Sequence, residues 1–183
     1  MVKRSIIACA ILLGFMSIAA YSDTIGVYDD TQGLSCNITD DMALKHVYVV
    51  HATSLGATAS EWSAPLPACW TNTTWLSDTE PFGMPGNSQT GKAVGYGTCQ
   101  AGPSAIHVLT INYFVQGSSP PCCLYPVLPP SWAATINVVD CDNVLLPAVG
   151  LTSTINGDGT CPCGYPVPVE ESTWGKVKAL YAD

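Results

Sequence analysis

Eight cysteines beyond residue 22 constrain this chain more than any other feature. An even number of cysteines in an exported protein predicts four disulfides. Zinc sites use spaced Cys or His pairs, and redox sites use C-x-x-C before a helix. Here the close spacings are CC and CPC instead, so we expect disulfides and no metal site or cofactor. The cysteines are Cys36, Cys69, Cys99, Cys122, Cys123, Cys141, Cys161 and Cys163.

The adjacent cysteines Cys122 and Cys123 lie within the proline-rich stretch SSPPCCLYP. Neighbouring cysteines rarely bond to each other, because closing a ring across one peptide bond is strained. We therefore expect Cys122 and Cys123 to bond different partners, and Cys161 and Cys163 to do the same. The sequence leaves the pairing itself open.

The first 22 residues predict a secretory signal peptide. Lys3 and Arg4 precede an apolar run over residues 5–20, and small residues at Ala20 and Ser22 suit cleavage before Asp23. The run is shorter than the roughly 20 residues that span a bilayer, so we expect no membrane span. The rest, residues 23–183, is predicted to be one secreted domain at the cell surface or beyond it.

The net charge of the chain argues against some classes of binding partner. Residues 23–183 contain four lysines, no arginine and all 14 acidic residues, a formal charge of −10. Such a chain repels phosphate backbones and anionic lipid surfaces, so we expect no nucleic-acid partner. The acidity keeps a secreted protein soluble and does not identify its partner.

Short runs of β-branched and aromatic residues, separated by turn formers, predict an all-β sandwich. Residues 70–91 carry turn formers throughout and predict a long ordered loop or a distorted edge. In 105–115, strict alternation places Ile106, Val108 and Phe114 on one face and Leu109 and Tyr113 on the other. The expected strands are 24–30, 43–53, 60–66, 92–99, 105–115, 134–141 and 143–150.

Two further predictions concern the edges of the sheet and the C-terminal end of the chain. Strands 105–115 and 134–139 carry no charged residue, so either would invite self-association if it lay at an edge; the alternative is that both are central. Residues 170–183 predict a short helix docked on the sandwich. Trp174, Val177 and Tyr181 fall on one helical face there.

Segments of the chain resemble known modules. HVYVVHATSLGATASEWSAPL is similar to cohesin-like and related immunoglobulin-like modules, in which strands comparable to AVGYGT and IHVLTINYFV follow. The ending VEESTWGKVKALY resembles the C-terminus of uncharacterised secreted proteins of environmental bacteria. The first resemblance implies a β-sandwich that binds a partner protein, and neither implies a catalytic residue.

The candidates for catalysis are few. His46 and His51 differ by five positions and so face opposite sides of one strand. His46 and His107 can meet across strands and bind a metal, which is the hydrolase alternative. The chain contains no G-x-S-x-G or H-E-x-x-H motif. Adjacent acidic residues at turns, such as 29–30 and 40–41, are typical of solvated loops. We therefore expect no enzyme.

Other motifs suggest binding or modification. Tryptophans in loops can stack on sugar rings, which makes Trp70 and Trp75 the candidates for a carbohydrate-binding module. Asn37 and Asn72 lie in N-glycosylation sequons. NGDGT at 156–160 weakly resembles a calcium loop, but a hairpin turn explains it better. The full set of tryptophans is Trp62, Trp70, Trp75, Trp132 and Trp174.

The sequence thus predicts a secreted, disulfide-linked β-sandwich that is not an enzyme. It would serve as an extracellular structural or protein-interaction module, with a protein partner or another copy of itself. The alternatives are a carbohydrate-binding module and, last, a metal-dependent hydrolase.

Overall fold

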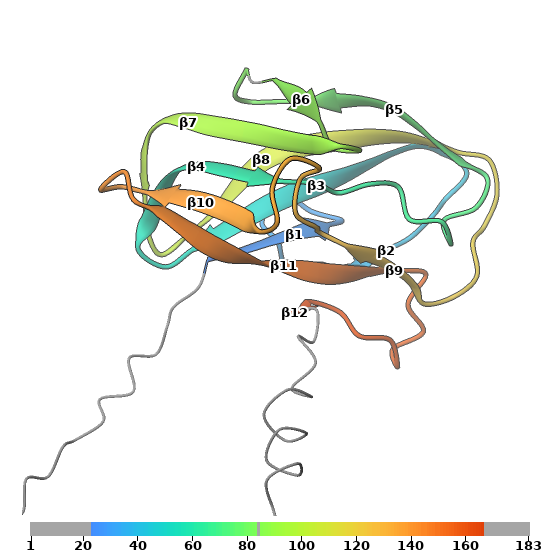
Figure 1. Cartoon of the computed structure of the whole chain (residues 1–183). Coiled ribbons are helices and arrows are strands. Elements are labelled where there is room, and N and C mark those ends of the chain that lie inside the picture. Colours follow the sequence, from blue (N-terminus) through green and yellow to red (C-terminus); the bar gives the residue numbers. More distant parts are fainter. Residues whose placement is uncertain (1–22, 84, 167–183) are drawn as a thin grey trace, which may run out of the picture.

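The computed structural model describes residues 23–83 and 85–166 of the 183. All regular structure in this part is β-strand (Figure 1). No helix within it is long and apolar enough to cross a membrane. The predicted signal peptide, residues 1–22, and the predicted helix, residues 170–183, lie outside the described residues.

Twelve strands account for most of the described chain. In order they are β1 (Thr24–Tyr28), β2 (Asn37–Ile38), β3 (Ala43–Thr53), β4 (Gly56–Trp62), β5 (Thr73–Thr79), β6 (Gly86–Asn87), β7 (Gly91–Ala101), β8 (Ser104–Val115), β9 (Cys123–Pro126), β10 (Ile136–Asp140), β11 (Leu145–Ile155) and β12 (Tyr165–Pro166). The seven predicted strands are all present. Of the five other strands, β2, β9 and β12 all pair with β11, and β5 and β6 lie within residues 70–91.

The strands form two layers that meet where β1 runs parallel to β11 (Figure 1). The hydrogen-bonded order is β5-β8-β3-β1-β11-β10-β4-β7-β6. The layer β5-β8-β3-β1 therefore faces the layer β11-β10-β4-β7-β6. Each layer has an outer face, and these two faces carry the candidate sites described below.

The core fills the space between the layers. Alternate residues of β3 and β8 enter it, with Val47, Val49, Leu109 and Ile111 all fully buried. Tyr113 and Tyr125 meet at its centre, where their hydroxyl oxygens are 2.6 Å apart. Because each strand buries one set of alternate side chains, the other set is free to build the outer faces.

A β-bulge at Val108 makes the predicted faces of 105–115 partly wrong. Leu109 lies opposite Val49, but the next pair is His107 with Val50, so Val108 has no partner in the ladder. Ile106 and Val108 therefore face the core together with Leu109. The extra residue shifts the alternation by one at this point.

Residues 70–91 contain an edge strand rather than a loop without pairing. β5 pairs with β8 along one side, with a register shift between Trp75 and Ser77, so the distorted-edge interpretation is confirmed.

The idea that 105–115 or 134–139 lies at an edge is wrong. β8 lies between β3 and β5, and β10 lies between β4 and β11, so both strands are already paired on two sides.

Candidate functional site

All eight cysteines form disulfides, as the sequence predicted. The pairs are Cys36–Cys163, Cys69–Cys123, Cys99–Cys141 and Cys122–Cys161. Cys122 has a positive φ of 62°, which turns the chain just before β9. Cys123 enters the core with 3% exposure. The neighbouring cysteines thus bond different partners on different sides of the chain.

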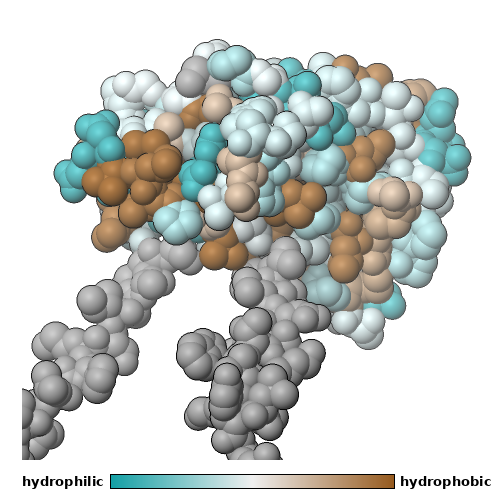
Figure 2. All heavy atoms as spheres, in the orientation of Figure 1, coloured by the Kyte–Doolittle hydropathy of each residue, from teal (hydrophilic) through white to brown (hydrophobic). Residues whose placement is uncertain are grey.

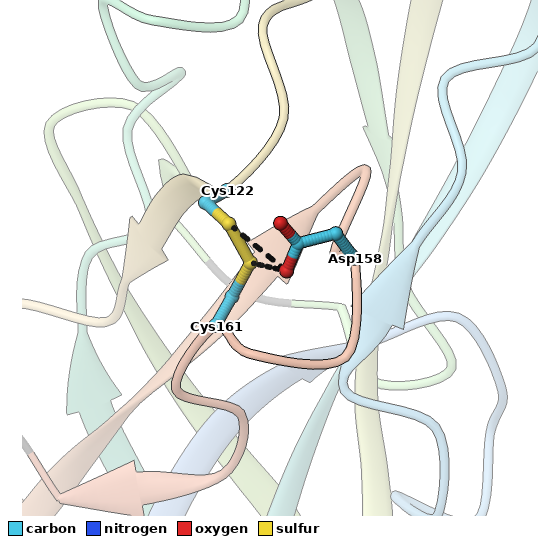
Figure 3. Close-up of side chains that lie close together, drawn as sticks. All are labelled: Cys122, Asp158 and Cys161. Atoms are coloured by element: carbon cyan, nitrogen blue, oxygen red, sulfur yellow. Dashed lines mark hydrogen bonds between the residues drawn. A yellow bond between two sulfur atoms is a disulfide. The ribbon is translucent and has the colours of Figure 1, made fainter.

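Cys122, Cys161 and Asp158 are the sole group of potential metal ligands that the described residues bring together. Asp158 Oδ1 lies 3.2 Å from Cys161 Sγ and 3.6 Å from Cys122 Sγ (Figure 3). Both sulfur atoms belong to one disulfide, so neither can act as a thiolate. The cluster therefore links two loops through a disulfide and offers no thiolate to a metal.

The histidines do not converge. His46 lies opposite Asn112 in the β3–β8 ladder, whereas His107 lies opposite Val50, several rows away. His107 packs edge-on against Tyr48, with ring centroids 5.5 Å apart, and burial lowers its pKa. The register thus rules out the metal site suggested for His46 and His107. His51 points into the core on the opposite face from His46, as predicted.

The outer face of β3, β8 and β5 is an open surface with three cross-strand rows. We call this surface the β3–β8–β5 face. Leu44 and Phe114 are direct partners in the first row and are 54% and 43% exposed. Its three rows contain no Asp, Glu, Lys or Arg, and Lys45 and Asp78 point to the other side of the sheet. Its rows are Leu44–Phe114–Thr74, His46–Asn112–Ser77 and Tyr48–Thr110–Thr79.

Asn112 holds the centre of the β3–β8–β5 face together. Its Oδ1 is 2.6 Å from His46 Nδ1 on β3. Its Nδ2 donates to Ser77 Oγ at 3.2 Å and to Thr79 Oγ1 at 3.0 Å on β5. These bonds fix polar side chains of three strands beside the exposed Leu44 and Phe114. A preorganised surface of this kind loses less conformational entropy on binding.

The two tryptophans proposed for sugar binding do not form a surface platform. Trp70 is 2% exposed and packs on Tyr113, with ring centroids 4.7 Å apart. It follows Cys69, whose disulfide to buried Cys123 draws the segment onto the core. Trp75 is half-buried against the core, and its Nε1 donates to Asp78 Oδ1. Among the described residues the exposed indole is that of Trp132.

The first sequon begins in β2 at Asn37, the second begins in the turn before β5 at Asn72, and NGDGT follows β11. Asn37 and Asn72 are both exposed, and glycosylation at either remains a prediction. Asn156 Nδ2 donates to Asp40 Oδ1, whereas Asp158 Oδ1 accepts from the Thr160 amide. The two side chains have separate partners and do not share a calcium position. The segment belongs to a longer connection between β11 and β12, so the tight hairpin turn was wrong.

Sequence comparison identifies no relatives. No protein-family model matches the chain, and no curated protein matches it.

Solved structures do resemble it. The sixth cohesin of scaffoldin B from Acetivibrio cellulolyticus, solved in complex with a Cel5 dockerin, superposes with a TM-score of 0.51 at 12% identity. The match covers 75% of this chain and 99% of that one.

Two other cohesins give lower scores. The seventh ScaB type I cohesin of Pseudobacteroides cellulosolvens has a TM-score of 0.45 at 10% identity, covering 78% of this chain and 96% of that one. A non-cellulosomal cohesin of Archaeoglobus fulgidus has a TM-score of 0.41 at 13% identity, covering 74% and 88%. On the strength of the match to the Acetivibrio cohesin, the described part of this chain has a cohesin-like β-sandwich fold.

Proposed function

We propose that this protein is a secreted, non-catalytic module that binds a partner protein through the β3–β8–β5 face. The observation that carries the proposal is the exposed pair Leu44 and Phe114, held side by side on a sheet face that has no Asp, Glu, Lys or Arg in its three rows. Contiguous apolar groups on the surface of a soluble protein mark interaction sites.

The charge distribution supports the same face. The chain has a formal charge of −8, yet the three rows of this surface contain no Asp, Glu, Lys or Arg. The centres of protein interfaces are depleted of charged residues and enriched in aromatic ones. Phe114 supplies the aromatic group, and Leu76, at the irregular point of β5, adds a side chain that is 48% exposed. A partner docking here would bury apolar area without leaving charges unpaired.

The setting outside the cell rests on two features. Four disulfides are typical of oxidising compartments. The predicted signal peptide would deliver the chain there. The cohesin solved with its dockerin is an example of this fold in a protein complex, and it supports a protein partner for this chain as an expectation.

The test starts with a photo-crosslinking residue placed at Thr74, which is exposed beside Phe114. The matched control carries the same group at Leu55, which is 77% exposed in the turn between β3 and β4. Both proteins are incubated with the proteins secreted by the source cells. A partner of the β3–β8–β5 face should crosslink at Thr74 and not at Leu55.

Binding of the purified partner then decides the proposal. The double substitution Leu44→Asp with Phe114→Asp should weaken binding by at least about tenfold, because it places charge at the centre of the contact. Leu55→Asp should leave the affinity unchanged. Equal crosslinking at the two positions, or full affinity of the double variant, would show that this face is not the binding surface.

A further inference from the structure

An open trough lies on the outer face of the other layer, over β7, β4 and β10. Its volume is about 330 Å³. The register places Ala93, Glu61 and Asn137 in one cross-strand row. Gly95, Ala59 and Val139 form the next row. Apolar side chains gather over the β10–β11 end of this layer (Figure 2).

Small residues create the hollow. Ala59, Ala93 and Gly95 form its floor, so the middle of the sheet lacks the side chains that would otherwise fill it. Val139 and Leu145 rise along one side, and Leu145 is 63% exposed. The floor is flat and apolar, and its width is that of two strands, which suits a flat ring rather than a bulky group.

The exposed Trp132 stands beside Glu61, one of the residues that line the trough. Trp132 is 55% exposed, and its Nε1 donates to Glu61 Oε2 at 3.1 Å. Its six-membered ring covers Gly91, where a Cβ would come within 2.5 Å of it. Gly91 also has a φ of 148°, so two independent constraints favour glycine under the indole. The ring is therefore held in place before any ligand arrives.

Glu61 and Asn137 add a fixed polar pair. Asn137 Nδ2 donates to Glu61 Oε1 at 2.6 Å. Each carboxylate oxygen of Glu61 accepts one bond from the protein and keeps a lone pair free. The second proton of Asn137 Nδ2 makes only a long bond, 3.4 Å, to Thr135 O. The pair thus offers two acceptors and one donor at the edge of the indole.

We propose that this trough binds a neutral saccharide, with one pyranose ring stacked on Trp132. Two adjacent hydroxyls of the sugar donate to the two oxygens of Glu61, and a hydroxyl oxygen accepts from Asn137. The next ring of the chain lies over Ala59, Ala93 and Gly95. This site is on the opposite layer from the β3–β8–β5 face and does not depend on the function proposed for it.

The chemistry of the lining favours hydroxyl groups over other ligands. A hydroxyl both donates and accepts, and so satisfies Glu61 and Asn137 together, whereas an ammonium group only donates. The lining contains Glu61 and no Lys or Arg, which disfavours phosphates, carboxylates and sulfated sugars. The C–H faces of a pyranose with equatorial substituents are flat and apolar, and match an indole face.

The experiment uses the oxidised protein and three hexasaccharides as probes. Two are β-1,4-linked, of glucose and of N-acetylglucosamine, and the third is α-1,4-linked glucose. Binding is followed by calorimetry and by the indole N–H resonance of Trp132, which is assigned from its loss in Trp132→Phe. A β-1,4-linked probe should shift this resonance and bind saturably.

Four variants test the geometry. Trp132→Ala should weaken binding by at least about tenfold. Ala59→Gln keeps Trp132 but fills the floor, and should weaken binding to a similar degree. Glu61→Gln should cost about three- to tenfold, because it replaces one acceptor by a donor. Leu34→Ala, in a loop and 84% exposed, should bind like the wild type.

The proposal fails on either of two results. The first is that none of the probes shifts the Trp132 resonance up to about 5 mM. The second is that Trp132→Ala and Ala59→Gln, shown to be folded by their NMR spectra, retain full affinity.

Discussion

His51 Nε2 lies 3.1 Å from Asp23 Oδ2, and the imidazole is completely buried. The other ring nitrogen, Nδ1, is 2.8 Å from Tyr96 Oη, which in turn donates to Ser60 Oγ at 2.7 Å. This chain of hydrogen bonds crosses the interior from β3 to β7 and β4. Asp23 precedes β1, and its backbone oxygen accepts from the Val149 amide of β11. The contact therefore joins the two layers where they meet.

The first prediction concerns acid stability. Burial alone would raise the pKa of Asp23, but hydrogen bonds from His51, the Ser54 amide and Thr53 outweigh it and hold the pKa below 3.8. The ionised carboxylate thus stabilises the fold above its unfolded pKa, and this contribution fades as the pH falls through the lower, folded value. Asp23→Asn should therefore be less stable at pH 7 and lose less stability below pH 3.8 than the wild type.

Urea unfolding between pH 2 and 7 measures this difference. The matched control is Asp142→Asn, on the exposed turn between β10 and β11. Its stability curve should run parallel to that of the wild type. A curve for Asp23→Asn that also runs parallel to the wild type would contradict the role assigned to the carboxylate.

The second prediction concerns the tyrosine pair in the core. Tyr125 Oη donates to the Ala64 carbonyl at 2.9 Å, so the proton between the two phenols comes from Tyr113. Tyr125→Phe removes both bonds and leaves two buried polar groups with fewer partners. We expect a loss of about 1–3 kcal/mol in the free energy of unfolding. Tyr48 is half-buried on the outer face, and Tyr48→Phe should lower the free energy of unfolding by less than about 0.5 kcal/mol. Equal losses of stability in the two variants would contradict the role assigned to the buried hydroxyl of Tyr125.

The third prediction compares two disulfides with similar loop lengths. Cys69–Cys123 spans 54 residues and Cys99–Cys141 spans 42, so each contributes about 4 kcal/mol in the chain-entropy model. Only the first enters the core, through Cys123. Replacing both of its cysteines by alanine also leaves a cavity, which should cost about 1–2 kcal/mol more. Thermal unfolding of the two double variants checks the order, and the opposite order would contradict it.

The sequence predicted the strands better than it predicted their faces. Alternation in 43–53 separates Val47 and Val49 from His46, and the structure buries the two valines and exposes the histidine. In 105–115 the same rule failed at Val108, because a bulge depends on the register with β3 and not on local pattern. The prediction of four disulfides needed only the even number of cysteines and the oxidising compartment to which the predicted signal peptide would direct the chain.

The candidate sites could be predicted only in part. Trp70 is buried because Cys69 bonds Cys123, and no spacing rule reveals that pairing. Trp132 is one of five tryptophans in the chain, and the sequence pattern does not set it apart from the others. Its exposure depends on Gly91, 41 positions earlier in the sequence, whose missing side chain makes room for the ring. The sites therefore depend on contacts between distant segments, which a single sequence does not show.

The last prediction concerns hydrogen exchange and the edges of the layers. β8 is bonded on both sides, so its amides over 109–113 should exchange slowest in the oxidised protein. β5 pairs on one side only among the described strands, and its ladder is interrupted between Trp75 and Ser77. Its amides should therefore exchange faster by at least about tenfold. Exchange measured by NMR at several protein concentrations tests both statements. Protection of β5 that rises with concentration would show that this edge pairs with another copy, and fast exchange in β8 would contradict its central position.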